Sequence, residues 1–174
     1  DMRMDQYQRI TAADIVNDTP YEELADAIYK WGEERYARRI ARKIIRARED
    51  KRIATTFELA EIIRCAYPRR YYHRIDPATR TFQAIRIMVN SELVVLEAAL
   101  EKALLHAADE ALLCVISFHS LEDRIVKHTF RRWKSEGKVR VLTKKPLLPH
   151  EDECVDNPKA RSAKLRIAKR SLKA

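Results

Sequence analysis

The sequence contains very little glycine: Gly32 and Gly137 are the only two among 174 residues. Sites for dinucleotides and related cofactors usually need a glycine-rich turn, because the backbone must approach the ligand closely there. Neither glycine stands in a turn of that composition. We therefore expect the chain as given to lack a cofactor site of this kind.

Long apolar runs and paired cysteines are also absent. The longest largely apolar stretch, residues 111–118, has the length of a strand, whereas a membrane-spanning helix needs about 20 residues. Cys65, Cys114 and Cys154 are far apart and odd in number, which fits reduced thiols better than a disulfide framework. No cysteine and histidine spacing typical of zinc occurs, so we expect no metal site. These absences predict a cytoplasmic protein.

Positive charge dominates among the residues that are present. The formal net charge is +9 at pH 7, and the isoelectric point is about 9.6. Lysine and arginine release counterions when they bind phosphates, so this balance favours a polyanionic partner such as a nucleic acid. The alternative is a basic surface that has no such partner.

The sequence up to residue 107 has the pattern of consecutive helices. The capping-box patterns at residues 11–14 and 55–58 predict helix starts. Pro20 and the two glutamates after Tyr21 predict another start, with an end near Gly32. Apolar residues at helical spacing define the remaining helices. Two of the predicted helices begin at residues 11 and 55. The other three span residues 20–32, 33–48 and 77–107.

The pattern changes after residue 110. The continuous apolar run 112–116 predicts a strand that is buried on both faces of a parallel sheet. Truncation of Ile116 should then open a core cavity that costs about 2–5 kcal/mol. Three strands with so few helices cannot form a sheet covered on both sides, so we expect the last part of a larger α/β sheet. The other predicted elements are a helix over 120–133 capped by Ser120, strands over 138–142 and 162–168, and an acidic loop over 146–158.

Five sequence blocks resemble one family, in the order in which that family has them. The blocks are residues 1–5 (Asp-Met-Arg-Met-Asp), 32–41, 76–93, 116–124 and 157–166. Together they resemble the bacterial ribosomal RNA small-subunit (cytosine-N4-)methyltransferase family, or MraW family. The resemblance covers nearly the whole chain, and it corresponds to the C-terminal portion of the family's proteins only. Two positions depart from that pattern. Asp76 replaces a frequent histidine, and residues 106–111 replace a Pro-Gly-Gly turn.

The resemblance implies an α/β fold that is predominantly helical as given. Residues 1–10 would end the N-terminal half of a Rossmann-like catalytic domain, and residues 11–90 would form an all-helical, RNA-binding insert. Residues 91–174 would return to the catalytic domain. The family binds S-adenosylmethionine mainly through residues that would precede Asp1. We therefore assign no cofactor ligand in this chain and expect the chain alone to be inactive.

The resemblance also implies the reaction and its partners. The complete enzyme would transfer a methyl group from S-adenosylmethionine to N4 of a cytidine in small-subunit ribosomal RNA. The expected partners are that RNA or the ribosomal subunit, together with a second copy of the chain in a homodimer, and no membrane. Two other functions stay open: a non-catalytic RNA-binding or ribosome-binding module, and a helical protein-interaction module.

Candidate substrate residues follow the predicted strand. Open α/β sheets bind ligands at the carboxyl ends of their strands, which places Ser117, His119 and Ser120 at such an end. We predict that His119 lines the pocket for the target base; in the alternative it bonds to backbone. Asn157 and Arg161 either reach the substrate or brace the strand after them. The acids and arginine at residues 122–124 either hold the strand-end loop or complement the helix dipole.

Basic residues of the helical part are candidate RNA contacts. Arg80 and Arg86 begin the last predicted helix of that part, and a helix N-terminus with arginine can bind phosphate. In the alternative they pack against neighbouring helices. The basic stretch 35–48 forms either an RNA-binding surface or a solvated charged face. The aromatic and basic segment 69–74 favours RNA, because aromatic rings and guanidinium planes can stack on splayed bases.

Overall fold

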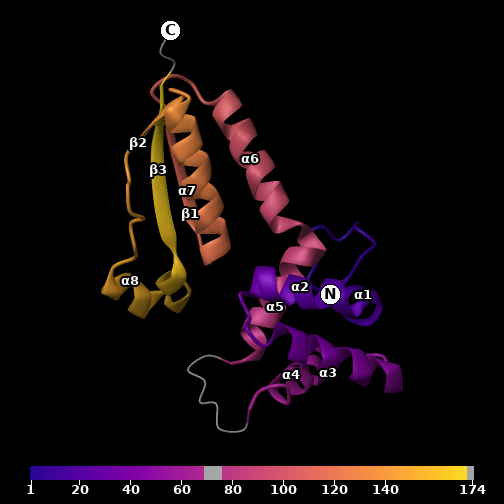
Figure 1. The fold of residues 1–174 in the computed structure, drawn as a ribbon. Coiled ribbons are helices and arrows are strands. Elements are labelled where there is room, and N and C mark those ends of the chain that lie inside the picture. The colour runs from indigo at the N-terminus through magenta and orange to yellow at the C-terminus, as the bar shows by residue number, and fades with distance from the viewer. Residues whose placement is uncertain (69–75, 172–174) are drawn as a thin grey trace. The chain divides into compact units, whose positions relative to one another are not determined.

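The chain divides into two compact units, Asp1–Glu92 and Leu93–Ala174. The computed structural model describes residues 1–68 and 76–171 (Figure 1). The predicted RNA-stacking segment 69–74 therefore lies outside the described residues. Among the helices of the described ranges, none is long and apolar enough to cross a membrane.

The first unit is helical, as the sequence predicts. Both predicted capping boxes are present: the hydroxyl of Thr11 accepts from the Asp14 N–H at 3.2 Å, and that of Thr55 from the Glu58 N–H at 3.1 Å. Each box satisfies two backbone donors at a helix start. The helices described in this unit are α1 (Ala12–Asp18), α2 (Tyr21–Gly32), α3 (Ala37–Asp50), α4 (Thr56–Arg64) and α5 (Ala78–Asn90).

The core of the first unit lies between α2, α3 and α5. Ile28 of α2, Ile40 of α3 and Ile85 of α5 are fully buried in one cluster. Gly32 allows α2 to approach α5, because a Cβ at this position would lie 2.7 Å from the carbonyl oxygen of Arg80. The last residue of α2 is therefore glycine for close packing, whereas the left-handed backbone that follows belongs to Glu33, with φ of 49°.

The single helix predicted over residues 77–107 is wrong. The structure has two helices, α5 and α6 (Glu92–His106), separated by Ser91 with φ of 49°. Asn90 ties the N-terminal segment to α5: its amide donates to the Met2 carbonyl at 2.9 Å, and its side-chain oxygen accepts from the Met4 N–H at 2.7 Å. Residues 1–10 thus belong to the first compact unit, and their assignment to a catalytic domain stays a prediction.

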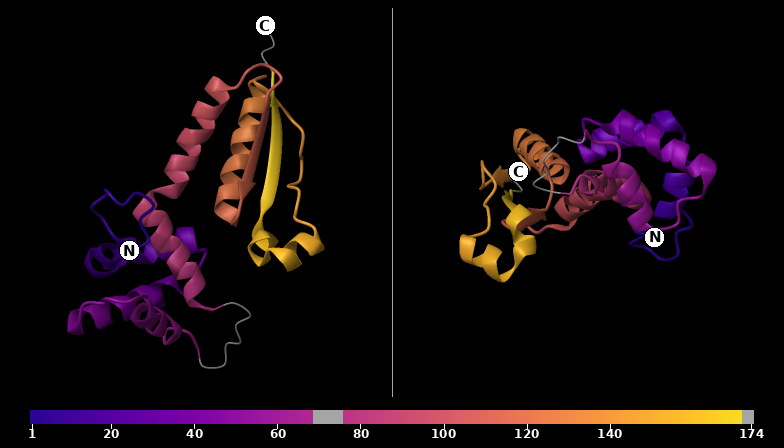
Figure 2. Two further views of the ribbon diagram at one scale, coloured as in Figure 1. Left: turned by 180° about the vertical axis from the view of Figure 1, so that it is seen from behind. Right: turned by 90° about the horizontal axis from the view of Figure 1, so that it is seen from below.

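The second unit contains a small sheet with the strand order β1-β3-β2, in which both pairs are antiparallel (Figure 2). The predicted parallel arrangement of the first strand is wrong, because β1 pairs with β3 and Cys114 faces Ile167 across the pair. The mixed α/β class with mostly helical content is confirmed. Besides α6, the elements of this unit are β1 (Leu112–Ser117), α7 (Ser120–Ser135), β2 (Val139–Val141), α8 (Glu151–Asp156), the 3₁₀ helix η1 (Pro158–Ser162) and β3 (Lys164–Arg170).

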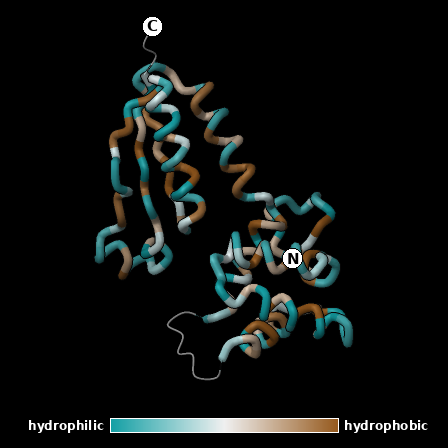
Figure 3. Tube along the Cα trace, viewed as in Figure 1, coloured by the Kyte–Doolittle hydropathy of each residue, from teal (hydrophilic) through white to brown (hydrophobic). Residues whose placement is uncertain are grey.

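One face of this sheet is covered and the other is open. Val126, Phe130 and Trp133 of α7 form a buried cluster with Ala168 of β3 and Leu100 of α6. Apolar and polar residues alternate along α7, as a helix that covers a sheet requires (Figure 3).

Successive residues of a strand point to opposite faces, and those of β1 that point away from the cluster are exposed. Leu112 is 59% and Ile116 58% exposed, and Cys114 between them is exposed as well. The prediction that β1 is buried on both faces, with a core cavity at Ile116, is therefore wrong for this chain.

The segment predicted as a loop over residues 146–158 contains a helix that the sequence analysis missed. Helix α8 carries Glu151, Asp152 and Glu153 in its first turn, where carboxylates complement the helix dipole. Its residues are all exposed or half-buried, so no apolar stripe marked it in the sequence. Pro158 then begins η1, which leads directly into β3.

Candidate functional site

The predicted strand-end residues gather at the junction of β1 and α7. Ser117 ends β1 and is 1% exposed, and its hydroxyl has no hydrogen-bond partner within the described ranges. Phe118 follows and is 54% exposed. The junction thus combines a buried, unsatisfied hydroxyl with an aromatic ring that reaches solvent.

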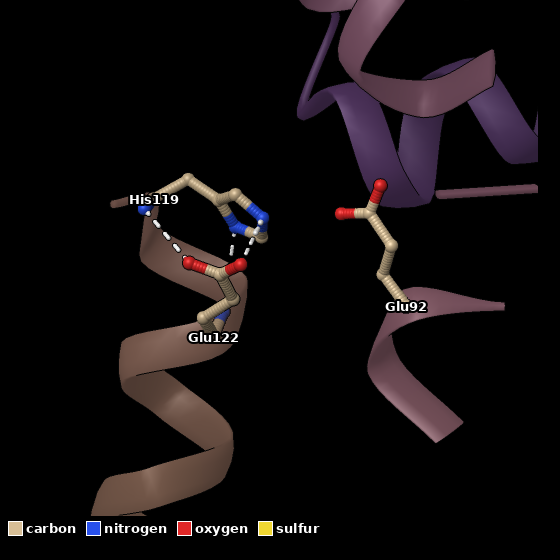
Figure 4. Close-up of side chains that lie close together, drawn as sticks. All are labelled: Glu92, His119 and Glu122. Carbon is tan, nitrogen blue, oxygen red and sulfur yellow. Dashed lines mark hydrogen bonds and ion pairs between the residues drawn. The ribbon is translucent and has the colours of Figure 1, made fainter. Parts of the chain in front are cut away.

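His119 is the N-cap of α7. Its Nδ1 accepts from the Glu122 N–H at 3.4 Å, and the Glu122 carboxylate accepts from the N–H groups of Phe118 at 2.8 Å and His119 at 3.4 Å (Figure 4). This is a capping box with histidine in the usual place of serine or threonine. The prediction that Ser120 caps the helix is wrong, since Ser120 is its first helical residue. His119 does bond to backbone, and its role in a base pocket stays a prediction.

The capping geometry also fixes the state of the His119 ring. A ring nitrogen that accepts from backbone carries no proton, so the imidazole proton lies on Nε2. That nitrogen is 3.2 Å from Oε1 of Glu122, without the alignment of a hydrogen bond. Burial raises the pKa of Glu122, but the adjacent His119 ring and the backbone N–H groups of Phe118 and His119 outweigh burial and leave that pKa lowered. Both ring nitrogens lie close to Glu122, so the ring is held in one orientation.

Asp123 fastens α7 to the sheet. The Arg166 guanidinium of β3 donates to both Asp123 oxygens, at 2.7 and 3.1 Å, and both side chains are largely buried. The hydrogen bond from Arg166 lowers the pKa of Asp123. Glu122 therefore holds the strand-end loop, as one of the two alternatives predicts, whereas Asp123 binds β3; both also lie in the first turn of α7.

A hollow of about 430 Å³ lies beside Phe118. Arg161, a predicted site residue, lines it together with Lys159, and both are exposed. Neither side chain has an ion pair among the described residues, and sequence reasoning missed Phe118 and Lys159. The Asn157 side chain accepts from the Lys159 N–H at 3.2 Å at the start of η1, and the predicted role of Asn157 at the substrate stays a prediction. The lining residues are Phe118, Pro158, Lys159, Arg161 and Ser162.

The two arginines predicted on α5 differ in their surroundings. Arg86 makes two hydrogen bonds to the Glu92 carboxylate, at 2.7 and 2.9 Å. Arg80 donates to the Glu33 carbonyl at 3.3 Å and lies 3.8 Å from the Glu34 carboxylate, yet its side chain is 60% exposed. Both arginines therefore pack against neighbouring groups, and Arg80 also keeps a large exposed surface.

Glu34 is a buried carboxylate that sequence reasoning did not single out. It is 2% exposed and accepts from the Tyr67 hydroxyl at 2.6 Å and the Tyr36 N–H at 2.8 Å. Burial, followed by the hydrogen bond to Glu34, raises the pKa of Tyr67. This carboxylate connects the α2–α3 turn with the end of α4, and with Arg80 of α5, so it organises the first unit.

Helix α3 presents a stripe of cations opposite its buried face. Ile40 and Ile44 are buried, whereas the arginines and the lysine on the opposite face are exposed. No ion pair to any member of the stripe occurs within residues 1–68 and 76–171. By contrast, the Arg48 guanidinium donates to the Val16 and Thr19 carbonyls at 2.9 and 2.8 Å and is structural. The stripe consists of Arg38, Arg39, Arg42, Lys43 and Arg46.

Comparison with known proteins gives consistent matches along the whole chain. The model of the MraW methylase family matches residues 1–171. The Ribosomal RNA small subunit methyltransferase H of Sulfurihydrogenibium azorense is 52% identical over 171 residues, which cover 98% of this chain and 58% of that protein. The protein of the same name from Nostoc sp. strain PCC 7120 is 52% identical over 98% of this chain and 55% of its own length. A third, from Neorickettsia sennetsu, is 50% identical over 96% of this chain and 56% of its own length.

These matches establish the family and the extent of the chain within it. The chain spans little more than half the length of the curated relatives that it matches. The identity to these relatives over nearly the whole chain and the match to the family model both assign the chain to the same family. The chain belongs to the MraW methylase family.

Proposed function

We propose that this chain is the RNA-binding portion of an S-adenosylmethionine-dependent methyltransferase that modifies N4 of a cytidine in small-subunit ribosomal RNA. The observation that carries the proposal is the identity of about half of all residues with relatives that are named ribosomal RNA small subunit methyltransferase H. The cofactor-binding half would lie in the portion of those relatives that this chain does not match.

The described residues do not fit S-adenosylmethionine. Gly32 ends a helix with its backbone against Arg80, and Gly137 lies in the turn between α7 and β2 with φ of 72°. Neither follows a strand end, where a cofactor-binding turn would be needed. We therefore assign this chain no part in holding the cofactor, and its contribution is to bind and orient RNA.

The open face of the sheet supports a missing half. β1 is an edge strand of six residues, and its sequence has neither a charge nor a proline, the residues that usually prevent the addition of another strand. Beside that edge, Leu112 and Ile116 expose apolar surface of the kind that marks an interface. We propose that the cofactor-binding half pairs with β1 and covers this face.

The hollow at Phe118 is the proposed place for the target nucleotide. Enzymes that modify a base turn it out of its stack, and an aromatic ring can support the turned-out base. Phe118 supplies that ring, and Lys159 and Arg161 supply cations for the flanking phosphates. The cytosine amine is a weak nucleophile, so its orientation is the main contribution that these residues can make. His119 and Glu122 hold the loop that carries Phe118.

The α3 stripe is the proposed RNA-backbone surface. Arg38, Arg42 and Arg46 recur at intervals of four residues, so they form one row on the helix surface. A row of guanidinium groups without an ion pair within residues 1–68 and 76–171 suits the successive phosphates of an RNA strand. RNA binding by this surface should therefore weaken strongly as salt is added.

A salt titration tests the RNA surface. We expect the affinity for a fragment of small-subunit ribosomal RNA to fall linearly on a log–log plot against salt, with a slope of about −0.7 for each phosphate contacted. The triple variant Arg38→Gln, Arg42→Gln, Arg46→Gln should flatten that slope by about two. Lys30→Gln, on α2 and paired with Asp26, is the control and should keep the wild-type slope. An unchanged slope in the triple variant would exclude α3 as the RNA surface.

A non-catalytic RNA-binding module is the second candidate function. The poor fit of the described residues to the cofactor favours it for the chain on its own. An assay of RNA methylation distinguishes the two functions. When the unmatched portion of a relative is added, a methyltransferase portion should support cofactor-dependent methylation, whereas a non-catalytic module should not.

A further inference from the structure

A pocket of about 480 Å³ lies at the end of the sheet opposite Phe118. Arg170 ends β3 there, where its N–H donates to the Ala111 carbonyl at 2.8 Å, next to the start of β1. The strand β1 separates this end from Ser117 by about 17 Å, at about 3.4 Å per residue. The pocket is therefore a different place from the hollow at Phe118.

The guanidinium of Arg170 is incompletely satisfied. Its Nε and Nη1 atoms are buried, and neither has a hydrogen-bond partner within the described ranges. The Arg170 side chain is half-buried, and the burial of two guanidinium N–H groups without acceptors is costly because these groups lose hydration. A guanidinium in this state favours an anion or a strong acceptor beside it.

The other charged residues of the pocket add to its positive charge. Lys134, Arg140 and Lys169 line it together with Arg170. The one carboxylate in the lining, Glu110, forms an ion pair with Lys169. The lining thus keeps an excess of positive charge, and Lys134 and Arg140 are exposed at its mouth.

We propose that this pocket binds a phosphate group. The planar fork of a guanidinium matches two oxygens of a phosphate, and the lysine and second arginine add the charge that a dianion or a phosphodiester needs. Two sources offer this chemistry: a backbone phosphate of the RNA substrate and free inorganic phosphate. The RNA source rests on the proposed function, whereas the site itself does not.

Inorganic phosphate, titrated at constant ionic strength against chloride, tests the site on the full chain. We expect the Nε–Hε resonance of Arg170 to shift with a saturable curve and the melting temperature to rise by about 3 °C near saturation. Arg170→Met should abolish the rise, and it should fold because methionine keeps the unbranched apolar stem of this half-buried side chain. Arg140→Gln, at the pocket mouth, should weaken phosphate binding severalfold in a fold that keeps Arg170. Arg131→Gln, an exposed arginine on α7 outside the pocket lining, should behave as wild type.

RNA binding then separates the two sources. If the RNA backbone occupies the pocket, Arg140→Gln should reduce the salt slope by about 0.7 and phosphate should compete with RNA. If Arg140→Gln leaves the salt slope unchanged and phosphate does not compete with RNA, inorganic phosphate is the ligand of this pocket. That result would not bear on the proposed RNA surface of α3. The proposal is overturned if phosphate shifts neither the Arg170 resonance nor the melting temperature more than chloride does, or if Arg170→Met keeps the full rise.

Discussion

The two units of the chain bury their apolar residues to different extents. In the first unit, Leu24, Ile28, Ile40 and Ile44 are all fully buried, and their helices enclose one core. In the second unit, α7 covers one face of the sheet, while the large apolar residues of β1 on the other face are more than half exposed. The difference indicates that the helical unit is closed around its own residues, whereas the described residues leave one face of the sheet uncovered.

Removal of Asp123 should have the largest effect on the second unit. Asp123→Ala leaves the buried Arg166 guanidinium without its carboxylate, which should cost about 3–5 kcal/mol of unfolding free energy. Urea denaturation, followed by the fluorescence of buried Trp133, measures the change. The double variant Asp123→Ala, Arg166→Leu should regain most of the loss. A single variant within about 0.5 kcal/mol of wild type would show that the pair does not hold α7 to the sheet.

The same pair predicts a pH dependence. The hydrogen bond from Arg166 lowers the pKa of Asp123 below its ordinary value of 3.8. The carboxylate therefore contributes its full stability above that value and loses it as the pH falls through the lower pKa of the folded state. Acid titration of Asp123→Asn should lack this component, and an identical acid profile in both proteins would contradict the assignment.

Substitution of His119 should affect turnover more than stability. In a protein that joins this chain to the unmatched portion of a relative, His119→Ala should lower the methylation rate about a hundredfold, because the loop at Phe118 loses its position. Loss of the cap alone should cost about 1 kcal/mol of stability. His119→Asn keeps a good capping residue without an imidazole and is the matched control.

The control variant decides between the two roles of His119. Restored stability with impaired turnover in His119→Asn indicates a role in the pocket. Full recovery of both would show that His119 acts only as a cap and that its assignment to the pocket is wrong.

Gly32→Ala tests the closed packing of the helical unit. The added methyl group would meet the Arg80 carbonyl at 2.7 Å, so α2 and α5 must separate, at a cost of about 1–3 kcal/mol. Gly137→Ala is the comparison, since its Cβ would meet open space and only its φ of 72° opposes alanine. Thermal denaturation should place Gly32→Ala below Gly137→Ala. The reverse order would contradict the close approach of the two helices.

The smallest effect is expected on the open face of the sheet. Ile116→Ala should change stability by about 0.5 kcal/mol or less, because the side chain is already largely exposed. Val126→Ala, on the covered side, should cost more, since it leaves a cavity in a closed cluster. If the two variants are equally destabilised, the face carrying Ile116 is not open and the comparison between the units fails.

Local features of this fold could be predicted from the sequence, whereas the pairing of its strands could not. The capping boxes at Thr11 and Thr55 depend on residues three positions apart, and both are present. The apolar run of β1 predicted a strand, but its antiparallel partner β3 lies some fifty residues later and leaves no local mark. The break at Ser91 was missed because helical periodicity continues through it.

In the candidate site, too, local positions could be predicted from the sequence, whereas contacts between distant residues could not. The strand-end position of His119 was predictable, but its capping contact depends on how the ring turns toward Glu122. Phe118 carried a usable signal, as an aromatic residue directly after a strand. Lys159 and the unsatisfied Arg170 carried none, because each depends on groups that only the fold brings near it.

We propose that this chain supplies the RNA side of a methyltransferase and that the cofactor-binding half covers the open face of its sheet. Titration calorimetry with S-adenosylmethionine tests it most directly, on the chain alone and on the chain mixed with the unmatched portion of a relative. We predict no saturable heat for the chain alone, saturable binding for the mixture, and protection of Cys114 from alkylation in the mixture. Saturable binding to the chain alone at micromolar cofactor, which corresponds to about 8 kcal/mol, would contradict the account.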